Sequence, residues 1–253
     1  MRQPSSAAAR LCRAKPGSRR VSSRHLAGVL PLVALALYFL PAAASEPLPA
    51  PAPDSYTLEK SSGPAPAELP AALRDAIAAD GLEVKGAGGV LCDIWLRKEV
   101  PVAATPSQEL GVTFGQIAEG TFLGVMRIAT DTTDYRNQKV KAGLYTLRYA
   151  LHPVDGNHTG IAPQRDFALL APVSEDPDPA TVSRDEAIKR STKTTGTKHP
   201  SVWSLWPADD STGAPALRYQ DDSQSWLLTF RLALAGGAKV PMGMVVLGHA
   251  PEA

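Results

Sequence analysis

The sequence predicts a mainly β fold, an antiparallel β-sandwich of the jelly-roll-like type with one or two short helices. Three observations support this prediction. Apolar and polar residues alternate with a period of two in several segments after residue 81. The chain has 23 prolines and 20 glycines but only 6% aromatic residues, a composition that favours turns over long helices. Little helical pattern separates the alternating segments, as is typical of a sandwich.

Residues 1–45 have the pattern of a secretory signal peptide. The whole chain has 253 residues, and this first segment contains seven Lys or Arg residues and no acid. An uncharged apolar run, Leu26–Leu40, follows the cations, and the small residues Ala42–Ser45 come next. We expect cleavage after Ala44 or Ser45, which would leave a periplasmic or secreted protein beginning near Glu46. The alternative is a membrane-anchored protein that keeps this segment uncleaved.

Residues 46–69 read as a Pro/Ala-rich linker, because proline fixes φ and removes N–H donors. The folded domain is then predicted over residues 70–253. It begins with a short amphipathic helix, since Leu69, Leu73 and Ile77 share a helical spacing. Pro70 stands at the start of this helix and Gly81 follows its end.

The alternating segments predict the strands in order. Leu82–Lys85 and Val90–Arg97 form a hairpin around the glycine-rich turn 86–89. Further strands are expected at Gly120–Ala129, Leu144–His152, Phe167–Ala171, Val202–Trp206, Ser225–Leu234 and Met244–Gly248. The alternation within Leu144–His152 predicts one buried face and one face in solvent.

A second helix is predicted over Thr181–Lys193. Ser183 and Glu186 have the spacing of a capping box at its start. Gly196 is placed to end it.

Once the leader is removed, Cys92 is the one remaining cysteine, so no internal disulfide is expected. Strand alternation places Cys92 with Val90, Ile94 and Leu96 on one apolar face. We therefore expect a buried, structural thiol.

Polar residues that could bind a ligand or a metal lie between two predicted strands and after the second helix. The candidate ligand-binding residues are His152, Asp155, Asn157, His158, Arg165, Asp166 and His199. Within this set, His152, Asp155 and His158 could bind a divalent metal, although Asp-Gly-Asn is also ordinary turn chemistry. Arg165 and Asp166 fit either an ion pair that locks the loop or a clamp for a ligand.

Tryptophans offer a different kind of site. Trp95 falls on the face opposite the apolar one, so we expect it to be exposed. Trp95 or Trp203 could then stack on a sugar ring, whereas a buried aromatic side chain is the ordinary alternative.

The composition and the motifs limit the possible functions. The chain has 26 Lys and Arg residues against 25 Asp and Glu, a balance that argues against nucleic-acid binding. The sequence contains no Gly-x-Ser-x-Gly, HExxH or Walker pattern, so nothing in it positively supports catalysis. We therefore expect an exported, non-catalytic binding or interaction module. Its partner would be a protein, a small molecule or a glycan, and membrane contact would occur only through the leader during export.

Two other functions stay open. One is a metal-dependent hydrolase or metal-binding protein that uses the loop of His152, Asp155 and His158. The other is a carbohydrate-binding module. No cofactor is predicted apart from a possible divalent metal.

Three stretches carry a resemblance to a known group of proteins: Val140–Tyr149, Asp155–Gly160 and Ala162–Phe167. In these the chain resembles a family of uncharacterised bacterial proteins that have a signal peptide and a β-rich domain. The resemblance extends from about Gly81 to the C-terminus. It implies export from the cytoplasm, and it implies no particular activity.

Overall fold

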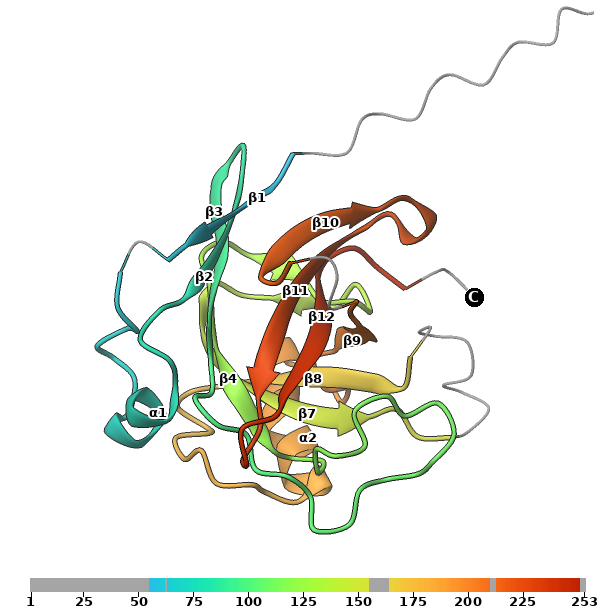
Figure 1. Ribbon diagram of the computed structural model, residues 1–253. Coiled ribbons are helices and arrows are strands. Elements are labelled where there is room, and N and C mark those ends of the chain that lie inside the picture. Colours follow the sequence, from blue (N-terminus) through green and yellow to red (C-terminus); the bar gives the residue numbers. More distant parts are fainter. Residues whose placement is uncertain (1–54, 62, 155–163, 210–212, 251–253) are drawn as a thin grey trace, which may run out of the picture. The chain divides into compact units, whose positions relative to one another are not determined.

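Antiparallel strands make up most of the structure (Figure 1). The computed structural model describes residues 55–61, 63–154, 164–209 and 213–250, which all belong to one unit of the chain, Pro51–Ala253. The strands are β1 (Thr57–Lys60), β2 (Leu82–Gly86), β3 (Gly89–Leu96), β4 (Phe122–Ile128), β5 (Thr132–Thr133), β6 (Lys139–Val140), β7 (Gly143–Leu151), β8 (Asp166–Pro172), β9 (Trp203–Pro207), β10 (Ala216–Gln220), β11 (Ser225–Ala233) and β12 (Lys239–Leu247). The helices are α1 (Ala71–Ala76) and α2 (Arg184–Thr195), and a 3-10 turn, η2, covers Asp221–Ser223.

Ten of these strands form one hydrogen-bonded sheet, and β5 and β6 form a small separate hairpin. The order in the large sheet is β1-β2-β3-β4-β7-β8-β9-β12-β11-β10. All pairings between its strands are antiparallel. The prediction of a mainly antiparallel β fold with few helices is therefore confirmed.

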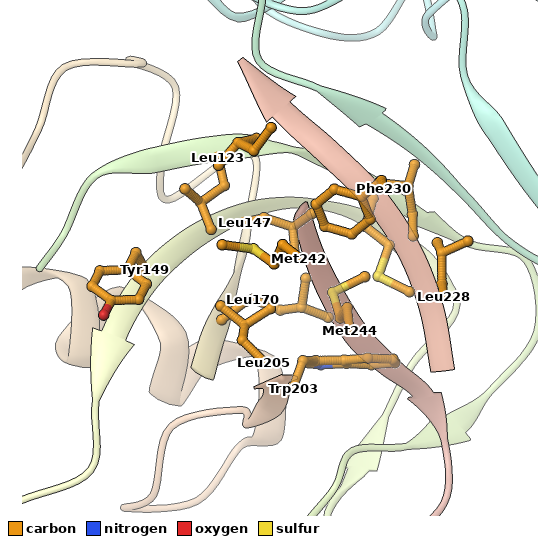
Figure 2. Close-up of a cluster of buried hydrophobic side chains, with 14 of the residues drawn as sticks. Leu123, Leu147, Tyr149, Leu170, Trp203, Leu205, Leu228, Phe230, Met242 and Met244 are labelled. Atoms are coloured by element: carbon orange, nitrogen blue, oxygen red, sulfur yellow. The ribbon is translucent and has the colours of Figure 1, made fainter. Parts of the chain in front are cut away.

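The main core lies on the inner face of this sheet, which curls around it. Side chains of β7, such as Leu147, lie opposite side chains of β11 and β12, such as Phe230 and Met244 (Figure 2). These three residues are at most 5% exposed. Burying each of them contributes roughly 1.5–3 kcal/mol. The face-to-face packing expected of a sandwich is thus achieved by one curled sheet whose two halves share a core.

The outer face of the sheet is covered in two places by helices. Near α1, the apolar side chains that pack together are Leu69, Leu73, Ile77, Trp95, Phe122 and Val125. The helix α2 lies against β8 on its outer face (Figure 1). Ala187 of α2 packs there with Phe167 and Leu169. Each helix therefore supplies the apolar cover that an exposed sheet face would lack.

This cover overturns the expectation that one face of β7 meets solvent. Thr146, Arg148 and Ala150 point away from the main core, yet they are at most 1% exposed. Thr146 and Arg148 bond to Asp176, which follows β8, and Ala150 packs in the cluster that includes Ala187 of α2. Alternation correctly separated the two faces of the strand, but it did not show that both would be covered.

Both ends of α2 are formed by the residues that the sequence predicted, Ser183 and Gly196. The hydroxyl of Ser183 accepts a hydrogen bond from the backbone N–H of Glu186 at 3.3 Å, and Ser183 is the N-cap. Gly196 has φ of 65° and its N–H donates to the carbonyl of Thr192. The helix thus begins at Arg184, after its cap, and continues two residues beyond the predicted end.

The first strand lies inside the segment expected to be linker. Thr57–Lys60 pairs with β2 from Thr57 opposite Lys85 to Lys60 opposite Leu82. Leu69, also in that segment, is 2% exposed in the cluster around Trp95. The folded region therefore starts before residue 70. The proline-rich surroundings hid a strand of four residues that has a single apolar member.

Two strands near the C-terminus also differ from expectation. The edge strand β10 was not predicted, because most of its side chains are only partly buried. The last strand begins at Lys239 rather than Met244, although Pro241 would normally interrupt a strand. β12 pairs with β11 on one side, and with β9 on the other side only over Met242–Met244. Pro241 therefore has no partner in β9, and the strand tolerates it there as an edge strand would.

The predicted signal peptide, residues 1–45, lies outside the described residues. Among the described residues, no helix has the length and apolar character needed to cross a membrane.

Candidate functional site

The structure describes four of the seven predicted ligand-binding residues. His152, Arg165, Asp166 and His199 are described, whereas Asp155, Asn157 and His158 lie outside the described residues. Three of the four described members belong to two hydrogen-bonded groups, and Asp166 bonds to other residues. His152 and Arg165 are joined directly, and His199 bonds to residues at the end of α2.

Arg165 locks a loop onto the sheet. Its Nε donates to the carbonyl of His152 at 3.0 Å, and its Nη1 donates to the carboxylate of Glu109 at 2.9 Å and to the carbonyl of Leu110 at 3.1 Å. The pairing partner is thus Glu109 rather than Asp166. These bonds connect the end of β7 to the loop that precedes β4.

Asp166 holds the same loop from inside. It is 0% exposed and accepts hydrogen bonds from the backbone N–H groups of Thr113 and Phe114, both at 2.9 Å, and from the phenol of Tyr149 at 2.6 Å. Burial and the bond to Asp166 raise the pKa of Tyr149 far above its ordinary value. This pair is closed to solutes, so it stabilises the loop rather than transferring protons.

His152 and His199 have different surroundings. The ring of His152 is stacked on Phe167, with centroids 4.3 Å apart and an angle of 22° between the planes, and the residue is 5% exposed. His199 is exposed, and its carbonyl accepts hydrogen bonds from the hydroxyls of Thr195 and Thr197. The structure does not join these two histidines into one hydrogen-bonded group.

No metal site is evident in the part of the chain that the structure describes. There, no group of three or more His, Cys, Asp or Glu side chains is arranged to hold a metal ion. Asp155 and His158 lie outside that part, so the metal hypothesis for their loop stays a prediction. Cys92 is buried as expected, and burial raises the pKa of its thiol strongly.

The expected exposure of Trp95 is wrong. Trp95 does lie on the outer face of β3, but α1 and the segment before it cover it, leaving it 1% exposed. Trp203 is 2% exposed in the main core. Neither ring therefore presents a face on which a sugar could stack.

A buried charge network that the sequence analysis did not identify lies on the outer face of β7. Arg148 uses all five of its N–H groups: two bonds go to Asp176, and the others go to the carbonyls of Gly120, Asp178 and Ala180. Asp176 also accepts from Thr146 and from Arg190 of α2. All these contacts are internal, so the network joins β7 to α2 and has no free group for a ligand.

Burial alone would raise the pKa of Asp176, because it disfavours the charged form. The hydrogen bonds and charge of Arg148, with Thr146 and Arg190, outweigh burial and hold that pKa below its ordinary value. Asp176 is therefore an anion at neutral pH.

The two ends of the large sheet meet along a line that we call the seam. β1 is the outermost strand at one end and β10 at the other, and the two strands approach each other. At one extremity the seam is closed by aromatic rings. The ring centroids of Tyr56 and Trp226 lie 5.4 Å apart, and those of Tyr219 and Trp226 lie 5.5 Å apart.

The other extremity of the seam is closed by backbone hydrogen bonds. The N–H of Val100 donates to the carbonyl of Ala233, and the N–H of Ala235 donates to the carbonyl of Val100, both at 2.8 Å. These bonds form a parallel bridge between Val100 and Leu234. The sheet is thus fastened at both extremities of the seam.

Between these closures lies a cavity of about 260 Å³, which we call the seam pocket. One wall consists of Leu82, Ile94 and Leu96, and the other includes Pro215 and Phe230. Ile94 is 0% exposed and Phe230 5%, and both belong to the main core. The apolar side chains that the pocket exposes are therefore Leu82 and Leu96, which are half-buried and pack against this core.

Charged residues also line the seam pocket. They are Asp80, Arg231 and Lys239, and all three are exposed. An apolar interior with a few polar groups at its opening is typical of small-molecule sites.

Two larger hollows lie on the outer surface beside Glu68. Their volumes are about 470 and 420 Å³, and both are lined by Glu68 and Leu144. Prolines contribute much of the remaining lining, and Arg127 there already donates two bonds to Asp93. The larger hollow also includes Ile128, a buried residue of the main core, so contact with the core does not separate these sites. The seam pocket differs from both hollows because its walls come from the two ends of the sheet, and we take it as the candidate for binding.

Sequence reasoning did not find the seam pocket. Its walls come from β2 and β3 on one side, and from β11, β12 and the residues just before β10 on the other. From the sequence, strand alternation predicted that Ile94 and Phe230 lie on inner strand faces, but it did not predict that these faces lie beside one pocket.

Comparisons with known protein families, with curated proteins and with solved structures found no match for this chain. The resemblance to exported bacterial proteins therefore stays a prediction.

Proposed function

We propose that this protein is an exported, non-catalytic binding module that holds a small, largely apolar molecule in the seam pocket. The observation that carries the proposal is the apolar wall of the pocket, where Leu82 and Leu96, packed against the main core, line a cavity of about 260 Å³. This volume is slightly below the range of about 300–1,000 Å³ common for drug-sized ligands, so the ligand would be small.

The bonding of buried acids supports a role without catalysis. Asp166 and Asp176 direct their carboxylates to internal donors, and Asp93 accepts from Ser61 and Arg127. A general acid or base must come within hydrogen-bond reach of a substrate. These three carboxylates instead stabilise the fold.

The pattern of the first 45 residues supports export. A basic segment, an apolar run and small residues are the features that secretion signals share. In this proposal the mature chain begins near Glu46 and the binding module acts outside the cytoplasm.

Binding of 1-octanol, an uncharged probe with an eight-carbon chain, tests the pocket. Titration followed by NMR of the backbone amides should show saturable shifts concentrated at Leu82, Ile94, Leu96 and Phe230. Ala78 lines the pocket, and Ala78→Phe should fill part of it and weaken octanol binding at least tenfold.

Ala79→Phe is the matched control, because Ala79 is the exposed neighbour of Ala78 and does not line the pocket. This variant should bind octanol as the unmodified protein does. The absence of saturable binding, or equal binding by the two variants, would contradict the proposal.

A further inference from the structure

We infer that the seam pocket selects an amphipathic anion, a molecule with a short apolar chain and a negatively charged group at one end. This inference rests on the proposed function and specifies its ligand class. The apolar chain would lie against Leu82 and Leu96, and the charged group would remain at the opening, near Lys239 and Arg231.

The two cations lie on the same face of neighbouring strands. In the register of β11 and β12, Arg231 is opposite Pro241 and Ala233 is opposite Lys239. Residues two apart on a strand share a face, so Arg231 and Lys239 form a diagonal pair. Both are exposed and both line the seam pocket, which places two positive charges along one side of the opening.

The one acid that lines the pocket is on the opposite wall and already has a partner. Asp80 forms an ion pair with Lys60 at 2.9 Å, and both side chains are more than 70% exposed. Lys239, in contrast, makes no ion pair with any residue that the structure describes. Lys239 therefore contributes a positive charge at the opening, which favours an anionic group there.

The apolar interior and the charged opening of the pocket favour different parts of one ligand. A carboxylate placed between the apolar side chains of the pocket would lose its water without gaining a partner, which is costly. A carboxylate at the opening stays hydrated and still lies near the cations, while the chain removes apolar surface from water. An anion with one apolar end satisfies both conditions.

Three probes with the same chain length test the inference: octanoate, 1-octanol and octylammonium. Isothermal titration calorimetry should show octanoate binding about three- to fivefold more tightly than octanol, the gain expected of an exposed ion pair, and octylammonium binding most weakly. Lys239→Gln should remove most of the preference for octanoate and leave octanol binding unchanged. Higher salt should weaken octanoate binding alone.

Lys198→Gln is the control, since Lys198 is an exposed cation that does not line the pocket. It should retain the preference for octanoate. Equal binding of octanoate and octanol, or a preference that survives Lys239→Gln, would overturn the anion inference and leave the proposed function standing. If none of the three probes binds, the proposed function fails as well.

Discussion

Arg148 is a side chain whose burial could not be predicted from its position in a strand. It lies on the outer face of β7, the face that alternation assigns to solvent, yet it is 1% exposed. Each of its N–H groups has an acceptor, and Asp176 balances its charge. A buried ion pair with full hydrogen bonding is tolerated, whereas breaking one partner is costly.

The substitution Asp176→Asn should therefore lower the free energy of unfolding by about 3–5 kcal/mol at pH 7, because Arg148 would stay buried without its counter-charge. Urea denaturation measures this loss. Glu175→Gln is the control, since Glu175 is the exposed acid directly before Asp176, and its effect should be within about 0.5 kcal/mol.

The same pair predicts the direction of a pH dependence. The folded-state pKa of Asp176 is lowered relative to the unfolded chain, so its contribution to stability is fully present above the unfolded pKa of about 3.9. That contribution is lost as the pH falls through the folded-state pKa. The stability difference between the native protein and Asp176→Asn should thus shrink below about pH 4, and a constant difference down to pH 2 would contradict this account.

At the level of elements, α2 depends on its two ends. Its interior contains several residues with modest helix propensity, among them Ser191, Thr192 and Thr194. Ser183 caps the first turn, and Gly196 takes the left-handed conformation that ends the last turn. Because α2 covers β8 and supplies Arg190 to the buried charge network, stable ends also protect the outer face of the sheet.

Gly196→Ala should lower the free energy of unfolding by about 1 kcal/mol, owing to the strain of φ near 65°. Steric overlap adds nothing, since no atom lies within 4 Å of the added methyl group. Amide exchange should become faster in the last turn of α2. Gly63→Ala is a matched control, because it has the same free space without a positive φ, and it should be neutral or slightly stabilising.

For the molecule as a whole, the seam is the feature on which closure of the sheet depends. The terminal strands β1 and β10 each have one hydrogen-bonded neighbour, and open edges of this kind usually need protection. Here rings protect one extremity and the Val100 bridge protects the other. Tyr56 is central to the aromatic closure, because its ring packs on Trp226 and also lies over Gly86.

Tyr56→Ala should accordingly reduce the free energy of unfolding by about 1–2 kcal/mol and loosen the two terminal strands. Hydrogen exchange followed by mass spectrometry should show faster exchange in β1 and β10 than in β7. Tyr56→Phe keeps the ring and should retain slower exchange in β1 and β10 than Tyr56→Ala. Unchanged protection of β1 in Tyr56→Ala would mean that the rings do not hold the seam.

The features that could be predicted from the sequence depend on residues close together along the chain. The hairpin of β2 and β3, the inner faces of β7 and β11, the burial of Cys92 and the caps of α2 are all of this kind. Strand alternation has a period of two and a cap needs only three or four residues, so a short window of sequence contains the necessary information.

The burial of Trp95, the network of Arg148 and the seam pocket could not be predicted in this way. Trp95 is covered from α1, Arg148 finds Asp176 across 28 residues, and the pocket joins Ile94 to Phe230. In each case the outcome depends on which distant segment covers a given face, and local patterns do not specify it. The alternation of side chains thus established that there would be a sheet with a core, whereas the order and curling of ten strands set where that core can be reached from outside.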